Sequence, residues 1–119
     1  MSDHRVKLNN FAWTSADKSE TINITVRSRM GVDEIDQSVI IRAVHTGTQL
    51  SERDATRLLV FSAFVLQTEH IDGHNFVWAT ADDSADKLRA AFEAWKELPA
   101  SLMVQWRSAI QEVDAPFSS

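Results

Sequence analysis

Polar residues that can bind a metal ion gather in one short segment of this chain. Glu69, His70, Asp72 and His74 lie within six residues, and imidazole and carboxylate groups are ligands for zinc or manganese. A metal site needs ligands that converge from a rigid frame, whereas these flank an Asp-Gly turn in no known metal-binding spacing. Because a polar turn after a buried helix accounts for the same residues, the sequence predicts no metal site here.

A second acidic run lies further along the chain. Asp82, Asp83, Ser84 and Asp86 resemble fragments of a calcium-binding loop, but the required glycine, the alternating ligand spacing and the final glutamate are missing. Acidic side chains are also favoured at the N-terminus of a helix by the helix dipole. We therefore interpret this run as the beginning of a helix.

No catalytic motif appears anywhere in the chain. Ser62, His45 and Asp72 supply the residue types of a nucleophilic triad, but there is no nucleophile elbow and no glycine-rich oxyanion loop. With only three glycines, the chain lacks a loop that could cradle a phosphate group. It has no cysteine, which excludes a cysteine nucleophile and thiolate-bound metals. The sequence predicts a protein that is not an enzyme and carries no cofactor.

The tryptophans are more informative than the titratable groups. Trp95 and Trp106 lie on the apolar stripes of predicted helices and are expected in the core. Trp13 and Trp78 lie near predicted strand ends, where an indole either packs at the edge of the core or anchors a partner. Apolar residues are concentrated in 58–66 and in the last two helices, which suggests more apolar surface than one small core uses. The residues predicted to bind a protein partner are Trp13, Phe61, Phe64 and Trp78.

Length and charge narrow the class of protein. A chain of 119 residues is expected to form a single domain, 1–119. The net charge of −5 falls entirely in residues 61–119, and an acidic half repels a phosphate backbone, so no nucleic-acid partner is expected. Arg27, Arg29 and Arg42 are interpreted as a solvated face. The longest apolar stretch is far shorter than the roughly 20 residues of a membrane span, so no membrane insertion is expected.

Residues 1–30 predict a β-hairpin. The apolar residues of the first strand, 6–13, change phase around Asn9–Asn10, as they would at a β-bulge. After a polar turn at Ser15–Glu20, apolar and polar residues alternate over Thr21–Arg29, which is typical of a half-buried strand. Two strands alone are marginally stable, so helices or a third strand must cover them.

Residues 31–69 predict two helices. The first spans Asp33–Thr46 and ends at Gly47. Ser51 is the expected N-cap of the second, at about Glu52–Glu69, which is apolar nearly all round. The core stripe expected on the first helix consists of Ile35, Val39, Ile40, Ala43 and Val44.

Residues 70–82 are expected to form a turn, with Phe76–Trp78 as a candidate third strand. Residues 83–114 predict a helical hairpin whose two amphipathic helices are separated at Pro99, and 115–119 form a tail. The expected fold is therefore α+β and mainly α, with an N-terminal hairpin packed on about four helices.

The C-terminal segment resembles the end of the small tail assembly chaperones of long-tailed bacteriophages. In those proteins a helix with an apolar and aromatic pattern is followed by a short Leu-Pro break and a helix with an internal tryptophan. The entry strand 22–27, followed by a helix, is similar to the same family. The matching positions are Leu88, Ala91, Phe92, Trp95, Leu98, Pro99 and Trp106.

The resemblance implies a non-enzymatic protein that acts in the host bacterial cytoplasm. Such chaperones bind the long hydrophobic tape-measure protein, recruit tail-tube subunits and leave before the virion is complete. The family carries no catalytic residue that could be transferred to this chain. The protein could also form a homo-oligomer. The alternative is a structural virion component of the tail or head–tail connector, which assembles into a ring through its open strand edges.

Overall fold

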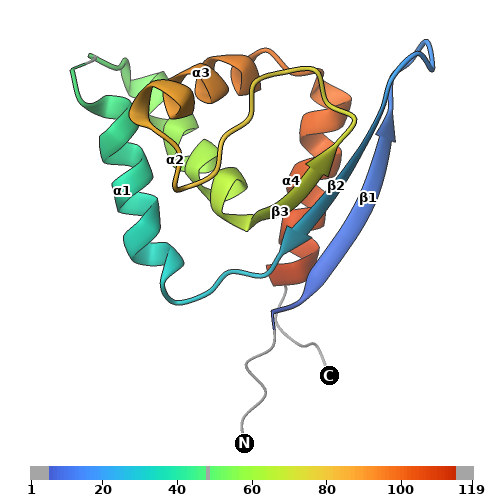
Figure 1. The fold of residues 1–119 in the computed structure, drawn as a ribbon, viewed down its shortest axis with the longest axis horizontal. Coiled ribbons are helices and arrows are strands. Elements are labelled where there is room, and N and C mark those ends of the chain that lie inside the picture. The colour runs from blue at the N-terminus through green and yellow to red at the C-terminus, as the bar shows by residue number, and fades with distance from the viewer. Residues whose placement is uncertain (1–5, 48, 115–119) are drawn as a thin grey trace, which may run out of the picture. The chain divides into compact units, whose positions relative to one another are not determined.

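The computed structural model describes residues 6–47 and 49–114 of the chain (Figure 1). Three strands and four helices form within these residues, which confirms a mainly α fold of the α+β class. The described residues group into two compact units. The sheet unit comprises those of 1–30, 67–74 and 100–119, and the helical unit comprises those of 31–66 and 75–99. The predicted tail at 115–119 lies outside the described residues.

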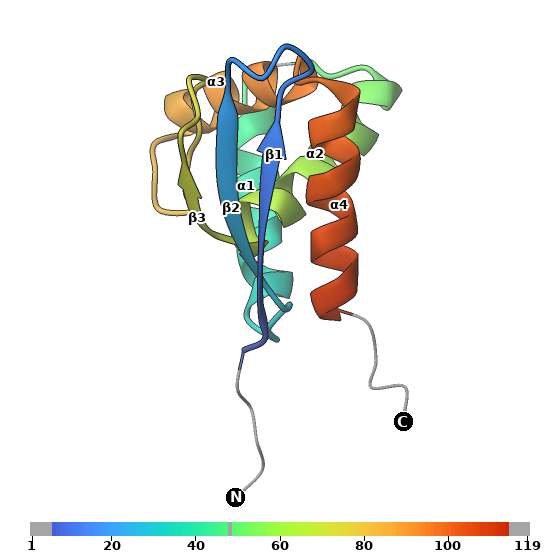
Figure 2. The same ribbon diagram turned by 90° about the vertical axis from the view of Figure 1, so that its right-hand side faces the viewer.

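The sheet unit is a three-stranded antiparallel sheet with one helix packed on it (Figure 2). The strands are β1 (Leu8–Thr14), β2 (Thr21–Arg27) and β3 (Thr68–Asp72), in the order β1-β2-β3. Helix α4 (Ala100–Asp114) packs against β1 and β2. The inward side chains of β2 are buried, which confirms the alternation expected from the sequence: Ile22, Ile24 and Val26.

The β-bulge predicted at Asn9–Asn10 is wrong. β1 pairs with β2 in one continuous register, from Leu8 opposite Arg27 to Thr14 opposite Thr21. Leu8 simply points outward, with 62% of its surface exposed. The irregularity lies on the other side of β2, where Val26 pairs with Thr68 and Thr25 pairs with His70, so β3 carries one extra residue.

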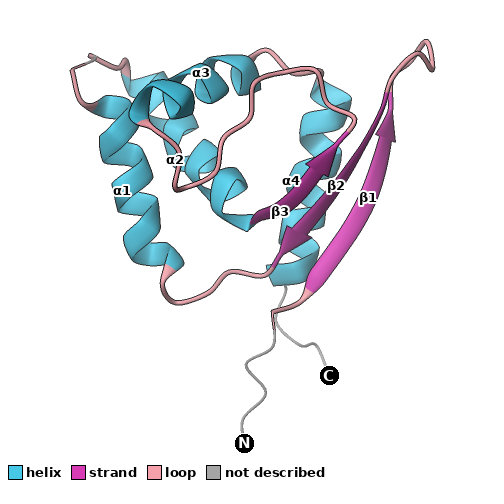
Figure 3. Ribbon diagram, in the orientation of Figure 1, coloured by secondary structure: helices cyan, strands magenta, loops and turns pink. Residues whose placement is uncertain are grey.

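The third strand is not the one predicted. Residues 76–78 form no strand (Figure 3), and β3 begins directly after the long helix instead. The turn expected from residue 70 onward begins only at Gly73, because residues 70–72 belong to β3, and the Gly73 φ of +83° suits glycine. A Cβ atom at Gly73 would lie 2.5 Å from the carbonyl oxygen of Thr21. The chain therefore leaves β3 through a close backbone approach that only glycine permits.

The helical unit contains α1 (Asp33–His45), α3 (Ala85–Lys96) and nearly all of α2 (Glu52–Gln67). The expected N-cap of α2 forms: Ser51 Oγ accepts from the backbone N–H of Asp54 at 3.1 Å. The acidic run interpreted as the beginning of a helix leads into α3, where Ser84 Oγ accepts from the backbone N–H of Lys87 at 3.2 Å. Helix α2 ends two residues earlier than predicted, because Thr68 and Glu69 belong to β3.

The last two helices follow each other across residues 97–99, as expected, but their apolar stripes serve different cores. Helix α3 contributes Leu88, Ala91, Phe92 and Trp95 to the helical unit. The stripe of α4 belongs to the sheet unit: Leu102, Trp106, Ala109, Ile110 and Val113. Helix α3 therefore belongs to the helical unit and α4 to the sheet unit.

Candidate functional site

Three of the four side chains predicted to bind a partner are buried. Trp13 in the sheet unit is 5% exposed, and its indole Nε1 donates to Ser101 Oγ at 3.0 Å. Phe61 and Phe64 in α2 are 0% and 2% exposed. Only Trp78 is partly exposed. These residues thus contribute to the packing of their own units, and their role in binding a partner stays a prediction.

The helical unit is held by an aromatic cluster. Phe61 lies at its centre, with ring centroids 5.7 Å from Trp78, 5.2 Å from Phe92 and 5.6 Å from Trp95. Phe64 meets Trp95 edge to face at 5.4 Å. Aromatic pairs at these separations stabilise a core beyond their buried area. The long apolar run of α2 is therefore explained by rings of the same unit.

The two helix-borne tryptophans are both core residues, as predicted. Trp106 is completely buried, and its Nε1 donates to Thr68 Oγ1 at 3.0 Å. Trp95 is 5% exposed, and its Nε1 has no hydrogen-bond partner among the described residues.

Helix α1 carries the exposed apolar side chains that the sequence assigned to the core. Ile40 and Val44 are buried, but Ile35 is 67% exposed and Val39 is 53% exposed. Val32, directly before the first residue of α1, is 51% exposed. Val32, Ile35 and Val39 are spaced i, i+3 and i+7, so they lie on one side of the helix. We call these three residues the α1 stripe.

The α1 stripe faces away from α2. Gln37 Nε2 donates to the carbonyl oxygen of Leu59 at 3.1 Å and to Ser62 Oγ at 3.0 Å, so Gln37 marks the side of α1 that meets α2. Successive helix residues turn by about 100°, which places Gln37 about 160° from both Ile35 and Val39. The stripe is therefore the outer side of α1 with respect to α2.

A signal for this surface exists in the sequence. The five apolar residues assigned to the α1 core span about half the circumference of the helix, which is wider than the stripe of about 100° that one core contact uses. One core contact therefore cannot cover all five side chains, and some of them are expected to stay exposed. Sequence alone does not say which edge of the arc faces the core.

The side chains that the sequence analysis considered as metal ligands or as a nucleophile do not form a site. Glu69, His70 and Asp72 lie on β3 and are exposed. Among the described residues, no three His, Asp or Glu side chains are placed to hold a metal ion. Ser62 is buried, and its hydroxyl donates to the carbonyl oxygen of Leu59 one turn earlier in α2 at 2.7 Å. This hydroxyl therefore has a structural role within the helix.

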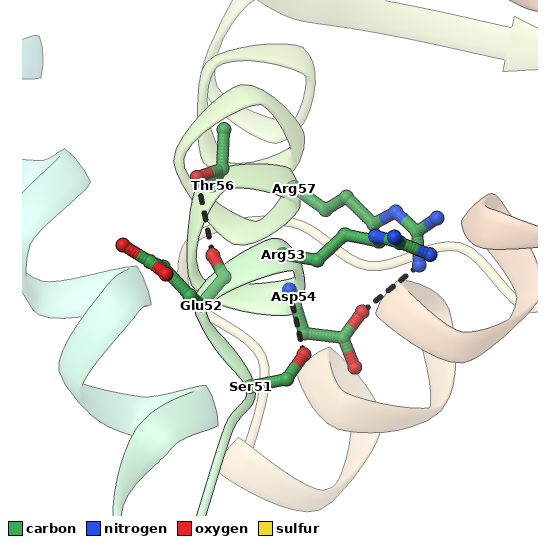
Figure 4. A pocket seen from close by; sticks show the side chains of 6 residues that line it. All are labelled: Ser51, Glu52, Arg53, Asp54, Thr56 and Arg57. Carbon is green, nitrogen blue, oxygen red and sulfur yellow. Dashed lines mark hydrogen bonds and ion pairs between the residues drawn. The ribbon is translucent and has the colours of Figure 1, made fainter.

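A wide, open depression surrounds the beginning of α2 (Figure 4). At its centre Asp54 Oδ1 pairs with Arg57 Nη1 at 3.1 Å and Asp54 Oδ2 pairs with Lys96 Nζ at 3.2 Å. The hydrogen bond from Lys96 holds the pKa of Asp54 below its ordinary value. The contact with Lys96 joins the beginning of α2 to the end of α3. The lining residues are Ser51, Glu52, Arg53, Asp54, Thr56 and Arg57.

Comparison with models of known families, with curated proteins and with solved structures finds no match to this chain. The resemblance to tail assembly chaperones thus stays a prediction from the sequence. Within the described ranges, no helix is long and apolar enough to cross a membrane. The α1 stripe is the surface feature from which a function can be argued.

Proposed function

We propose that this protein is a non-enzymatic tail assembly chaperone that binds an apolar helical segment of a tape-measure protein in the bacterial cytoplasm. The observation that carries the proposal is the α1 stripe. Three branched apolar side chains, each more than half exposed, lie on one side of a helix. Apolar anchors at this spacing are a recurring means by which helices recognise one another.

The charge distribution and the closed aromatic cluster of the helical unit support a protein that binds another protein at its surface. Residues 61–119 carry the whole net charge of −5, which disfavours a nucleic-acid partner. The aromatic residues of the helical unit are engaged with one another, so the client would bind at the surface without entering the core. Burial of an isoleucine or valine on binding contributes roughly 1.5–3 kcal/mol per side chain.

The test uses the full chain and synthetic peptides from the apolar helices of a tape-measure protein of a long-tailed bacteriophage. Binding is measured by fluorescence anisotropy or calorimetry. Ile35→Ser is expected to weaken binding about tenfold or more, because the variant loses apolar burial. The matched control is Val104→Ser on α4, where the valine is 63% exposed but lies outside the α1 stripe, and it is expected to bind as the natural protein does.

Absence of binding to every such peptide would contradict the proposal, as would equal affinities of the Ile35→Ser and Val104→Ser variants. Light scattering tests the alternative of a ring-forming virion component. A ring predicts a high and fixed stoichiometry, whereas a chaperone of this kind predicts a monomer or a small oligomer.

A further inference from the structure

The end of β3 places a carboxyl group beside an exposed peptide bond. Asp72, the last residue of this edge strand, is exposed, and its carboxylate forms no hydrogen bond or ion pair with the described residues. Gly73 is also exposed and has no side chain that could shield its main-chain nitrogen. The Asp72 carboxyl group can therefore reach the peptide bond that follows it.

The hydrogen-bond pattern of the sheet leaves the N–H of Gly73 without a partner. Ser28 N–H donates to the carbonyl oxygen of Lys7 at 2.8 Å, which adds a hydrogen-bonded pair to the β1–β2 ladder. Such pairs recur at every second residue, so the odd-numbered residues of β2 bond to β3, and Asn23 bonds to Asp72 opposite it. The C=O and N–H of one trans peptide point in opposite directions, so the Gly73 N–H points away from β2. It donates to no other backbone group among the described residues.

The fold also requires a glycine at this position. The φ of Gly73 is +83°, and a Cβ atom there would lie 2.5 Å from the carbonyl oxygen of Thr21. Any other residue would be strained by the positive φ and would press against the main chain of β2. The chain therefore keeps an aspartate followed by a glycine, which is the pair in which ring closure between side chain and main chain is least hindered.

We infer that Asp72 and Gly73 form a site of self-modification, at which Asp72 converts to isoaspartate through a cyclic imide. The exposed carboxyl group supplies the electrophilic carbon, and the unshielded nitrogen of Gly73 is the nucleophile. Both belong to adjacent residues, so the ring closes in an intramolecular step. The inference does not depend on the proposed function, because no client takes part in it.

The conversion is balanced without any oxidant or cofactor. The nitrogen of Gly73 bonds to Cγ of the protonated Asp72 carboxyl group, whose hydroxyl leaves as water with the proton that the nitrogen loses. Water then adds to one of the two ring carbonyl carbons and breaks its bond to the nitrogen, which regains a proton. Addition at Cγ restores aspartate. Addition at the main-chain carbonyl carbon leaves Gly73 joined through Cγ, which is isoaspartate.

Isoaspartate alters the end of β3. It adds one methylene group to the main chain at residue 72 and leaves the α-carboxylate as a side group. The added atom falls between the residue that pairs with Asn23 and the glycine that approaches Thr21. Both contacts cannot be kept with a longer main chain, so the modified protein is expected to lose the last pair between β2 and β3.

The test follows residue 72 in the full chain during several weeks at physiological temperature and mildly acidic pH. Endoproteinase Asp-N cleaves before aspartate but not before isoaspartate, so loss of cleavage between Ile71 and Asp72 measures the conversion. Methyl transfer from S-adenosylmethionine by an isoaspartyl methyltransferase detects the new α-carboxylate in the same peptide. Both signals are expected to rise together, with no change in the mass of the peptide.

Asp83 is the control within the chain. It is also followed by a small residue, Ser84, but Asp83 Oδ2 accepts from the backbone N–H of Thr80 at 2.7 Å and Oδ1 pairs with Lys87 Nζ at 3.6 Å. The Asp83 carboxyl group has to give up these contacts before it can cyclise. We therefore expect at least tenfold slower conversion at Asp83 than at Asp72.

Two variants of Asp72 test the ring. Asp72→Glu is expected to abolish the conversion, because the longer side chain would have to close a larger ring, which forms far more slowly. Asp72→Asn is expected to give the same isoaspartate faster, because its amide closes the same ring and leaves as ammonia. Isoaspartate in Asp72→Glu, or none in Asp72→Asn, would contradict a cyclic imide at this position.

The chain unfolded in guanidinium chloride decides whether the folded turn itself reacts. A domain of ordinary stability keeps fewer than about one molecule in a thousand unfolded, so reaction through the unfolded chain alone would be slowed by more than about a thousandfold. We expect the folded chain to convert within about a hundredfold of the unfolded rate. A larger suppression, or conversion at Asp83 as fast as at Asp72, overturns the inference.

Discussion

Arg89 on α3 donates a hydrogen bond from Nη2 to the carbonyl oxygen of Ala43 at 3.2 Å. The same guanidinium donates to the carbonyl oxygens of Thr46 at 3.0 Å and Val44 at 3.4 Å. The last carbonyl groups of a helix lack partners within the helix, and a cation there is also favoured by the helix dipole. Arg89 therefore closes the end of the helix that carries the α1 stripe.

Replacing Arg89 by alanine removes all three of these bonds. We expect Arg89→Ala to lower the free energy of unfolding by about 1–2 kcal/mol, since hydrogen bonds from a charged donor contribute more than neutral ones. Urea denaturation followed by tryptophan fluorescence measures the change. Arg53→Ala in the same unit is the control, because Arg53 is exposed and makes no ion pair among the described residues; its effect should stay below about 0.5 kcal/mol. Equal effects of the two variants would count against this role of Arg89.

Gly73 is the glycine on which the exit from β3 depends. Gly73→Ala is expected to destabilise the protein by about 2 kcal/mol or more, because the new Cβ would combine a positive φ with a 2.5 Å approach to the Thr21 oxygen. Gly31→Ala is the matched control, since its Cβ would meet no atom within 4 Å. Thermal unfolding of both variants distinguishes them. A Gly73→Ala protein as stable as Gly31→Ala would show that this turn differs from the structure described.

Thr68 accepts the hydrogen bond of the buried Trp106 indole at 3.0 Å. Thr68→Val keeps the shape of the side chain but removes the acceptor, so we expect a loss of about 1–3 kcal/mol, the cost of removing the partner of a buried polar group. Thr14→Val is the control, because Thr14 is exposed on β1 and its hydroxyl makes only a 3.3 Å contact with Thr21 Oγ1. Chemical denaturation gives both values, and no difference between them would contradict the structural role of this bond.

Asp17 makes the hairpin turn sensitive to acid. Hydrogen bonds from the Ser19 hydroxyl and backbone N–H, and then from the Ser15 hydroxyl, lower the pKa of Asp17 from 3.8 to about 2. A carboxyl group with a lowered pKa in the folded state stabilises that state above its unfolded pKa. The contribution is therefore complete above about pH 4 and is lost as the pH falls through about 2.

The prediction for Asp17 is a difference in stability that depends on pH. Asp17→Asn is expected to be less stable than the natural protein at pH 7, and the gap is expected to shrink as the pH falls below about 4. Urea denaturation from neutral pH down to about pH 3 measures it, with Asp82→Asn as the control at an exposed carboxyl group. A gap that stays constant over this range would show that the charge of Asp17 is not what stabilises the turn.

Local signals were sufficient for the helices and the central strand. The alternation of β2 could be read directly because each inward residue is β-branched and the intervening residues are polar, which a strand with one buried side satisfies. Ser51 marked the beginning of α2, and the acidic run around Ser84 marked that of α3. A serine hydroxyl that accepts from the N–H three residues later is a short-range interaction, so such signals can be found in the sequence.

The surface of α1 could not be predicted in the same way. Ile35 and Ile40 have the same hydrophobicity, but one is 67% exposed and the other is completely buried. The difference arises because Gln37 and Arg89 tie one side of α1 to α2 and α3. Those contacts join residues more than 20 positions apart, so no local pattern reports them.

Periodicity and capping act over a few residues, and for this reason the helices and the N-terminal hairpin are already evident in the order of the amino acids. Three features depend instead on the folded chain: which segment supplies the third strand, which core each of the last two helices serves, and which side of α1 stays exposed. Each of these three features depends on which segment, distant in the sequence, buries a given apolar side chain. Such contacts form only when the segments of a unit pack together, so the α1 stripe is evident in the tertiary structure and not in the local sequence of α1.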